Sequence, residues 1–357
     1  MTERSERGGS HRDDRGGRGY RGGSGGGDRG YRGGSGGGRG GGDRGGDRGY
    51  RGGDRGYRDG ERGRSRRVYD DEPRDGLLAD LVGHLHALDG RSYAAYKAIV
   101  GRYRAPAGWF LHIDRVQADP YAPPTRIHVD VPTDLHGLEL LDEADLLADA
   151  DRRLAVGDFL TRELHAGFRG TALSIASPGQ EILQRSSIIV RPDEKKEGPG
   201  WVLEIRARLA LPAQGRSIQG HEASRIVGRD LVRELEEAMD LTGERGDRLV
   251  RHIATLEDHR ALTATVARNG WVSFLADGSV LPRRSGVSDE PLDGGVPLEA
   301  PNSMAATVEL PHAETVRGTV VEAGVNVIVG GGYHGKSTLL SAIERGVYPH
   351  VPGDGRE

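Results

Sequence analysis

The segment Gly330-Gly331-Gly332-Tyr333-His334-Gly335-Lys336-Ser337 matches the pattern G-x-x-x-x-G-K-S. Its glycines let backbone N–H groups approach phosphate oxygens without a Cβ atom in the way. The apolar, β-branched residues 325–329 precede it and predict a buried strand, and residues 337–345 place leucine and isoleucine on one helical face. A strand, a glycine-rich loop and a helix in this order indicate a P-loop.

The motif predicts that residues 330–338, Thr338 included, bind ATP and Mg²⁺. Lys336 is expected to reach the β- and γ-phosphates, and the Ser337 hydroxyl is expected to ligate Mg²⁺. The start of the following helix adds its dipole and its free N–H groups to the anion site. Tyr333 and His334 occupy variable positions of the loop, and both contact with the nucleotide and simple exposure to solvent remain open for them.

A complete P-loop ATPase also needs a carboxylate after a second strand, to help hold Mg²⁺, and a group that positions the attacking water. Asp354 and Glu357 follow no apolar run and lie in a segment rich in proline and glycine. We therefore expect the front part of an ATPase domain, truncated after the P-loop helix and without turnover. A strand and a helix without the rest of their sheet leave an apolar face uncovered, so residues 325–357 are expected to be poorly stabilised.

Composition excludes several other classes of protein. The chain has no cysteine, which rules out disulfides and cysteine-based zinc sites. Its 13 histidines show no metal-ligand spacing such as H-E-x-x-H, and the sequence assigns no zinc. No apolar run reaches the roughly 18 residues of a membrane span, and no apolar signal region begins the chain. These patterns predict a soluble, cytoplasmic protein.

The first 67 residues differ from the rest in charge and complexity. They hold 18 arginines and 10 acidic residues, a net charge of +8, and because the whole chain carries −4 the remaining residues carry −12. Glycine accounts for 27 of the 67, and aliphatic residues are almost absent. Such a segment buries too little apolar surface to offset its chain entropy, so residues 1–75 are predicted to be a disordered, RGG/RGY-rich leader.

Arg-Gly-Gly recurs seven times in this leader, and Arg-Gly-Tyr recurs four times. Arginine pairs with phosphates, and arginine and tyrosine both stack on bases, so the repeats predict binding to RNA or other single-stranded nucleic acid. Interleaved aspartates weaken the attraction, and a soluble leader without a partner is the alternative. The residues expected to contact RNA are Arg18, Tyr20, Arg29, Tyr31, Arg48, Tyr50, Arg55 and Tyr57.

The remaining sequence mixes strand and helix patterns and predicts an α/β fold, with an N-terminal domain over residues 76–242 and the start of an ATPase domain over residues 243–357. Expected helices cover residues 77–85, 94–100, 223–241 and 247–268. Expected strands cover residues 110–113, 127–131, 171–175, 187–190, 201–209 and 271–275.

Two polar clusters leave alternatives open. The residues around the proline turn after the first of these strands either line a ligand groove or form a solvated loop; they are Asp114, Arg115, Gln117, Asp119 and Arg126. Arg283 and Arg284 lie ahead of the P-loop, where they either meet a phosphate or RNA or are simply solvated.

Several segments of residues 76–357 resemble the predicted ATPases of the ABC class. They are Leu88 to Tyr93, Ile113 to Pro120, Ser177 to Leu183, Leu281 to Gly286, and Gly330 to Ser337 continuing through Gly346-Val347-Tyr348 into Pro352 to Glu357. The resemblance implies an N-terminal α/β domain followed by an ABC-type nucleotide-binding domain. In a full-length relative it implies that ATP clamps two such domains into a homodimer. The signature sequence, the Q-loop and the Walker B acids of the family have no counterpart here, so only the P-loop, Gly330 to Thr338, carries over.

A relative of this family in trypanosome RNA-editing complexes is associated with RNA binding, which would agree with the leader. The resulting hypothesis is an ATP-binding protein, the N-terminal part of a soluble ABC-class ATPase that acts on RNA or a ribonucleoprotein. A non-catalytic RNA-binding or scaffold protein with an inert P-loop is the first alternative. A metabolic kinase is another, but no feature of the sequence indicates an acceptor pocket.

Overall fold

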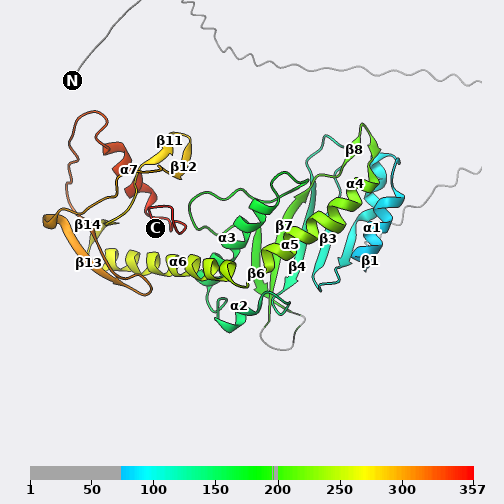
Figure 1. Ribbon diagram of the computed structural model, residues 1–357, viewed down its shortest axis with the longest axis horizontal. Helices are drawn as coiled ribbons and strands as arrows, with labels where there is room; N and C mark the ends of the chain where they lie inside the picture. The colour runs from blue at the N-terminus through cyan, green and yellow to red at the C-terminus, as the bar shows by residue number, and fades with distance from the viewer. Residues whose placement is uncertain (1–73, 195, 197–199) are drawn as a thin grey trace, which may run out of the picture. The chain divides into compact units, whose positions relative to one another are not determined.

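The computed structural model describes residues 74–194, 196 and 200–357 of the chain. The arginines and tyrosines expected to bind RNA lie outside these residues, so the structure does not test them. All the described residues belong to one compact unit. The mixed α/β character predicted from the sequence is confirmed in it (Figure 1).

A seven-stranded sheet forms the first half of the described residues, in the order β1-β2-β3-β4-β7-β5, with β6 pairing with β7 as well. Only the β1–β2 pair is parallel, and the other pairs of this sheet are antiparallel. Its strands are β1 Arg74–Leu77, β2 Gly101–Arg104, β3 Phe110–Arg115, β4 Thr125–Pro132, β5 Leu173–Ser174, β6 Ile188–Pro192 and β7 Trp201–Leu209.

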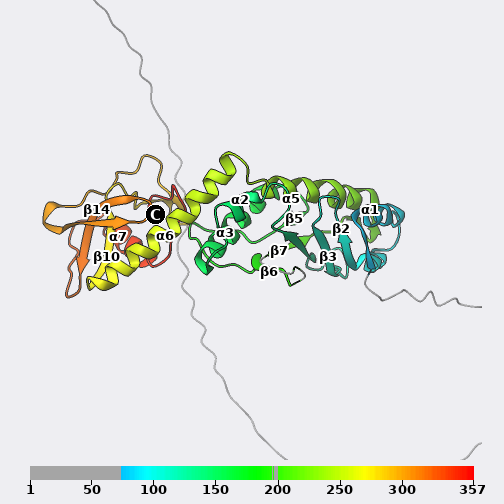
Figure 2. The same ribbon diagram turned by 90° about the horizontal axis from the view of Figure 1, so that it is seen from below.

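One face of this sheet is buried and the other is polar. Along β4, buried Ile127, Val129 and Val131 alternate with His128 and Asp130, which are only half-buried. This period of two is expected of a sheet covered on one side. Figure 2 shows helix α5 lying along one side of the sheet. The polar residues of β3, β4 and β7 therefore share the opposite face.

The helices of this half include two irregular ones. The α-helices are α1 Leu78–Ala87, α2 Glu139–Glu143, α3 Ala150–Gly167, α4 Gly220–Arg225 and α5 Leu231–Met239. The helix expected over residues 94–100 is a 3₁₀ helix, η1 Tyr93–Ile99, and a π-helical turn, η2 Ile226–Asp230, joins α4 to α5. A two-stranded hairpin, β8 Ala213–Gln214 with β9 Ser217–Ile218, precedes α4.

Sequence patterns missed the 18-residue helix α3. Buried Asp158 and Thr161 interrupt its apolar face, so it lacks the clean periodicity of an amphipathic helix. Asp149 marks its start, because this N-cap side chain accepts a hydrogen bond from the Arg152 N–H at 2.9 Å. At Gly157 the helix approaches β6 so closely that a Cβ atom would lie 3.2 Å from the Ile188 carbonyl oxygen.

The second half begins with the 25-residue helix α6 Glu244–Arg268. A three-stranded antiparallel sheet follows, in the order β10-β14-β13. Its strands are β10 Trp271–Ala276, β13 Ala305–Leu310 and β14 Glu314–Glu322. In the chain, β10 is followed by the hairpin of β11 Arg283–Ser285 with β12 Ser288–Pro291. The 3₁₀ turn η3 Asn302–Met304 comes next, before β13. The helix after the P-loop is α7 Lys336–Arg345.

Several predicted elements agree with this arrangement and others do not, since the helix expected over residues 223–241 is divided into α4, η2 and α5. The strand expected over residues 201–209 is confirmed as β7, and α6 confirms the helix expected over residues 247–268. The strand expected over residues 171–175 is reduced to Leu173–Ser174. The strand expected over residues 325–329 is wrong, because that run is exposed and pairs with none of the described strands.

None of the helices in the described ranges is long and apolar enough to cross a membrane.

Candidate nucleotide site and the contacts that support it

The P-loop lies between β14 and α7. Gly335 has φ 77°, in the left-handed region that favours glycine, and it is the N-cap of α7. Gly332 and Gly335 have nothing within 4 Å of the position where a Cβ atom would stand. The first backbone bond of the helix runs from the Leu339 N–H to the Gly335 carbonyl at 2.9 Å. The three preceding amides therefore lack an intrahelical partner, as an anion site at a helix start requires.

Lys336 folds back over the loop. Its Nζ donates hydrogen bonds to the carbonyls of Gly330 and Gly331, at 2.8 and 2.5 Å. The Gly331 N–H donates to Nδ1 of His334 at 3.2 Å, so His334 holds the loop's own backbone. Tyr333 has φ 62° and a fully exposed side chain. A lysine over the loop, free helix-start amides and an exposed Ser337 are the groups through which a P-loop would bind a triphosphate and its cation.

Residues 325–329 do not form the buried strand that their composition predicts. Val325, Val327 and Val329 are 97, 75 and 83% exposed. In the sheets formed by the described residues, no strand pairs with this run. A lone extended segment leaves its N–H and C=O groups unpaired and its apolar side chains in water, so β propensity alone does not make it a strand.

The segment after α7 forms hydrogen bonds with the loop that follows β5, while the poor stabilisation expected for residues 325–357 stays a prediction. The Ile182 N–H donates to the Pro349 carbonyl at 2.8 Å, and the Val351 N–H donates to the Gln180 carbonyl at 2.9 Å. At the end of α7, Arg345 Nη1 lies 2.6 Å from Glu181 Oε1. Arg345 also approaches Asp289 of β12, and Figure 1 draws α7 beside the β11–β12 hairpin. The P-loop helix is thus tied to the loop that follows β5.

Asp354 is the centre of a buried cluster of charges. It is 1% exposed and accepts hydrogen bonds from Arg283 Nη1 at 2.8 Å and Nη2 at 3.1 Å. Nδ1 of the buried His350 lies 2.8 Å from its Oδ2. Neither alternative considered for Arg283 is right, because this arginine forms a structural ion pair. Arg284 faces solvent and pairs with Glu290.

A second buried cluster surrounds Asp158 of α3, which is 1% exposed. Its carboxylate pairs with Arg185, lies 2.7 Å from Nε of Arg162 and lies 3.1 Å from Nε2 of His252 in α6. Arg162 also donates to the Gly179 and Glu181 carbonyls at 2.6 and 2.9 Å. Burial first, and then the two arginine charges, lowers the pKa of His252 to about 3. This cluster supports the same loop that α7 contacts.

Three of the segments singled out in the sequence therefore meet in space, although they are far apart in the chain. They are the loop at 179–183, the start of the hairpin at 281–283 and the segment 349–356. Sequence reasoning missed Asp158, Arg185 and His252, because nothing local marks a buried charge cluster.

For the polar cluster after β3, the sequence left open a ligand groove or a solvated loop, and different residues of the cluster take different roles. Gln117 is structural, since its N–H donates to Thr125 Oγ1 at 3.0 Å and its side-chain amide to the Ala122 carbonyl at 2.9 Å. Asp119 accepts from the Tyr121 N–H at 2.8 Å and shapes the turn. Asp114 and Arg126 instead line a cavity of about 570 Å³, together with His128, Arg206, Arg208 and several serines.

Within that cavity, Arg126 and Arg208 lie directly opposite each other on β4 and β7. Like charges in this position repel each other. No carboxylate among the described residues pairs with either arginine, whereas Arg206 pairs with Glu204. The cavity is therefore the electropositive part of the open sheet face.

Comparison with known families matches almost all of the described chain. A family model for the N-terminal part of ATPases of the ABC class matches residues 78–241, and a model for the P-loop domain of these ATPases matches residues 245–357. None of the curated proteins compared with the chain matches it.

Proposed function

Because the chain belongs to the ATPases of the ABC class, its P-loop domain supports nucleotide binding, and we propose that it binds Mg²⁺-ATP at residues 330–338 and acts on RNA. The loop glycines and the start of α7 would hold the phosphates through their N–H groups. Lys336 would exchange its contacts with the Gly330 and Gly331 carbonyls for phosphate oxygens. Mg²⁺, held in part by Ser337, would neutralise phosphate charge.

We further propose two folded domains, over residues 76–242 and 243–357, joined by the contacts of Arg345 and the segment 349–351 with the loop at 180–182. These contacts lead from the end of the P-loop helix into the N-terminal domain. Through these contacts, a change at the nucleotide site would be passed to residues 180–182.

The RNA part of the proposal rests on the leader. Its repeats supply cations and stacking faces but no fixed surface that could distinguish base edges, so binding is expected to be independent of sequence. The remaining residues carry −12, which opposes the approach of a polyanion. RNA binding is thus expected to reside in residues 1–67.

The test is a fluorescence-anisotropy titration of single-stranded RNA with residues 1–357 and with residues 68–357. We expect the full chain to bind oligo-U and oligo-A alike, and to lose at least about a hundredfold in affinity between roughly 50 and 200 mM salt. A matched variant with Tyr20, Tyr31, Tyr50 and Tyr57 changed to alanine keeps the charge of the leader. Its binding free energy for RNA should become less favourable by about 1–3 kcal/mol for each stacked base that is lost.

The proposal fails if residues 68–357 bind RNA as tightly as the full chain. Arg126 and Arg208 would then be the first residues to change, because Arg283 and Arg284 are engaged in ion pairs. RNA binding by a chain that does not bind ATP would support the scaffold alternative instead.

A further inference from the structure

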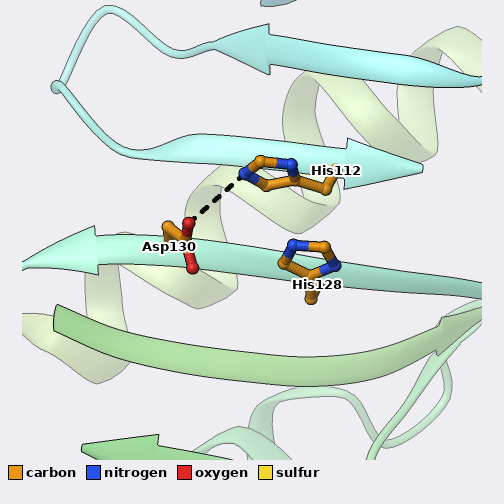
Figure 3. A group of neighbouring side chains, drawn as sticks. All are labelled: His112, His128 and Asp130. Atoms are coloured by element: carbon orange, nitrogen blue, oxygen red, sulfur yellow. Dashed lines mark ion pairs between the residues drawn. The ribbon is translucent and has the colours of Figure 1, made fainter. Parts of the chain in front are cut away.

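The open face of the large sheet carries a group of three side chains that sequence spacing does not reveal. His112 lies on β3 directly opposite His128 on β4, and Asp130 lies two residues beyond His128 on the same face (Figure 3). Their nearest nitrogen and oxygen atoms all lie within 4.8 Å of one another. Two ligands two residues apart on one strand and a third on its neighbour converge on one point, because the side chains of a strand alternate between faces.

One ring nitrogen in this group lacks a hydrogen bond. Nε2 of His112 is buried and finds no hydrogen-bond partner in the part of the chain that the structure describes. Asp130 Oδ2 is its nearest charged neighbour, at 3.4 Å, which is too long for a good hydrogen bond. Buried polar atoms almost always have a partner, and one that has none needs an explanation.

In each of the other two side chains, one polar atom already has a hydrogen-bond partner. Nδ1 of His128 lies 2.9 Å from Asp114 Oδ2, and Asp130 Oδ1 accepts a hydrogen bond from Arg191 Nη2 at 2.9 Å. Arg191 is itself shared with Glu204, at 3.0 Å, which offsets its charge. Metal-binding histidines and carboxylates are held by partners of this kind, which direct the remaining nitrogen or oxygen toward the ion.

We propose that His112, His128 and Asp130 bind a divalent transition-metal ion, with Zn²⁺ as the best fit. Two imidazoles and a carboxylate form a mixed N/O set, which suits Zn²⁺, Co²⁺ or Ni²⁺ better than Mg²⁺ or Ca²⁺. Three protein ligands leave one position of a tetrahedral ion for water or a second ligand. His128 and Asp114 also line the 570 Å³ cavity, so the ion would lie at the margin of that cavity.

Binding requires a small movement of the two imidazoles. Their rings are stacked, with centroids 4.1 Å apart and planes 10° from parallel, so their lone pairs do not meet at one point. Rotation about the Cβ–Cγ bond corrects this, and that torsion is soft in histidine. Metal binding should therefore replace the stack of His112 on His128 with coordination.

The site can be tested on the full chain without nucleotide, by competition for Zn²⁺ against a chromophoric chelator and by the visible absorption of added Co²⁺. We expect one tight site per chain and a Co²⁺ spectrum of tetrahedral intensity. His112→Ala, His128→Ala and Asp130→Asn should each abolish that spectrum. Asp114→Asn removes only the partner of His128 and should weaken Zn²⁺ binding by about 10- to 100-fold.

His136→Ala is the matched control, since the side chain of His136 is 97% exposed and lies outside the group. It should bind Zn²⁺ as the unmodified chain does. His112→Gln keeps a polar side chain at the half-buried position and replaces His112→Ala if the alanine variant does not fold, as judged by circular dichroism. The proposal is overturned if the unmodified chain shows no tight site, if the variants of the group bind as the control does, or if the control loses affinity equally.

Discussion

At the scale of single residues, two buried aspartates organise the charged interior of this protein. Asp158 gathers Arg162, Arg185 and His252, and Asp354 gathers Arg283 and His350. A buried carboxylate is costly unless it is paired and fully hydrogen-bonded, which explains why each aspartate has several partners. His252 is the member of the first group whose protonation state the environment changes most clearly.

His252 should make the protein less stable in mild acid. Its pKa is lowered to about 3 in the folded chain, by burial and then by Arg162 and Arg185, whereas the unfolded chain binds the proton near pH 6.5. The unfolded state therefore binds more protons below pH 6.5, and stability falls as pH falls from 6.5 toward 3. Between pH 7 and pH 5 the free energy of unfolding should drop about 2 kcal/mol further than in His252→Gln, as measured by urea unfolding at both values.

Equal pH dependence in the two chains would show that His252 takes up its proton in the folded state. His136→Gln is the control, because that exposed side chain has no buried environment to lose and should leave the pH dependence unchanged.

At the scale of elements, the helix α7 is held at its C-terminal end by Arg345 and by the segment 349–356 that follows it. The helix's own apolar side chains are only partly covered, and Leu340 remains 56% exposed. The segment 349–356 is by contrast bound to the loop at 180–182 and to residues 280–283. The P-loop helix thus has these contacts at its C-terminal end, while residues 325–329 before the P-loop are exposed.

Asp354→Asn should detach this anchor. The change removes the charge that faces Arg283 and His350 at a 1% exposed position, and breaking one side of a buried ion pair costs roughly 3–5 kcal/mol. Thermal or urea unfolding measures the loss. Glu290→Gln is the matched control, because it removes the partner of the neighbouring Arg284 at an exposed site, where about 0–1 kcal/mol is expected. Similar losses in the two variants would contradict a buried anchor at Asp354.

At the scale of the whole molecule, net charge divides the chain into a basic leader and an acidic remainder. Residues 1–67 carry a net charge of +8 and the remaining residues carry −12. Two parts of opposite charge need not share a binding site. ATP binding and RNA binding are therefore expected to be separable.

Two variants should separate ATP binding from RNA binding, because each variant should remove one of the two activities and keep the other. Lys336→Ala removes the cation expected to face the phosphates and should abolish or strongly weaken ATP binding by calorimetry, yet leave RNA affinity unchanged. Residues 68–357 should retain ATP affinity and lose RNA binding. Undiminished ATP affinity in Lys336→Ala would contradict the proposed site, and a loss of RNA binding in the same variant would mean that the two activities depend on one another.

The sequence by itself determined the features that depend on neighbouring residues. The glycine spacing and Lys336 identified the P-loop, the alternation along 127–131 identified β4, and residues 201–209 identified β7. A turn, a period of two and a period of 3.6 are local properties, so they can be recognised without a partner.

Only the tertiary structure decided which residues meet. The β3–β4 register placed His112 opposite His128, and packing buried Asp354 against Arg283, although 71 residues separate the latter pair. The run 325–329 has strand composition but no partner in the described sheets and remains exposed, because a strand is completed by its neighbour's hydrogen bonds. Register, burial and pairing are properties of two segments at once, and the pattern within one segment does not contain them.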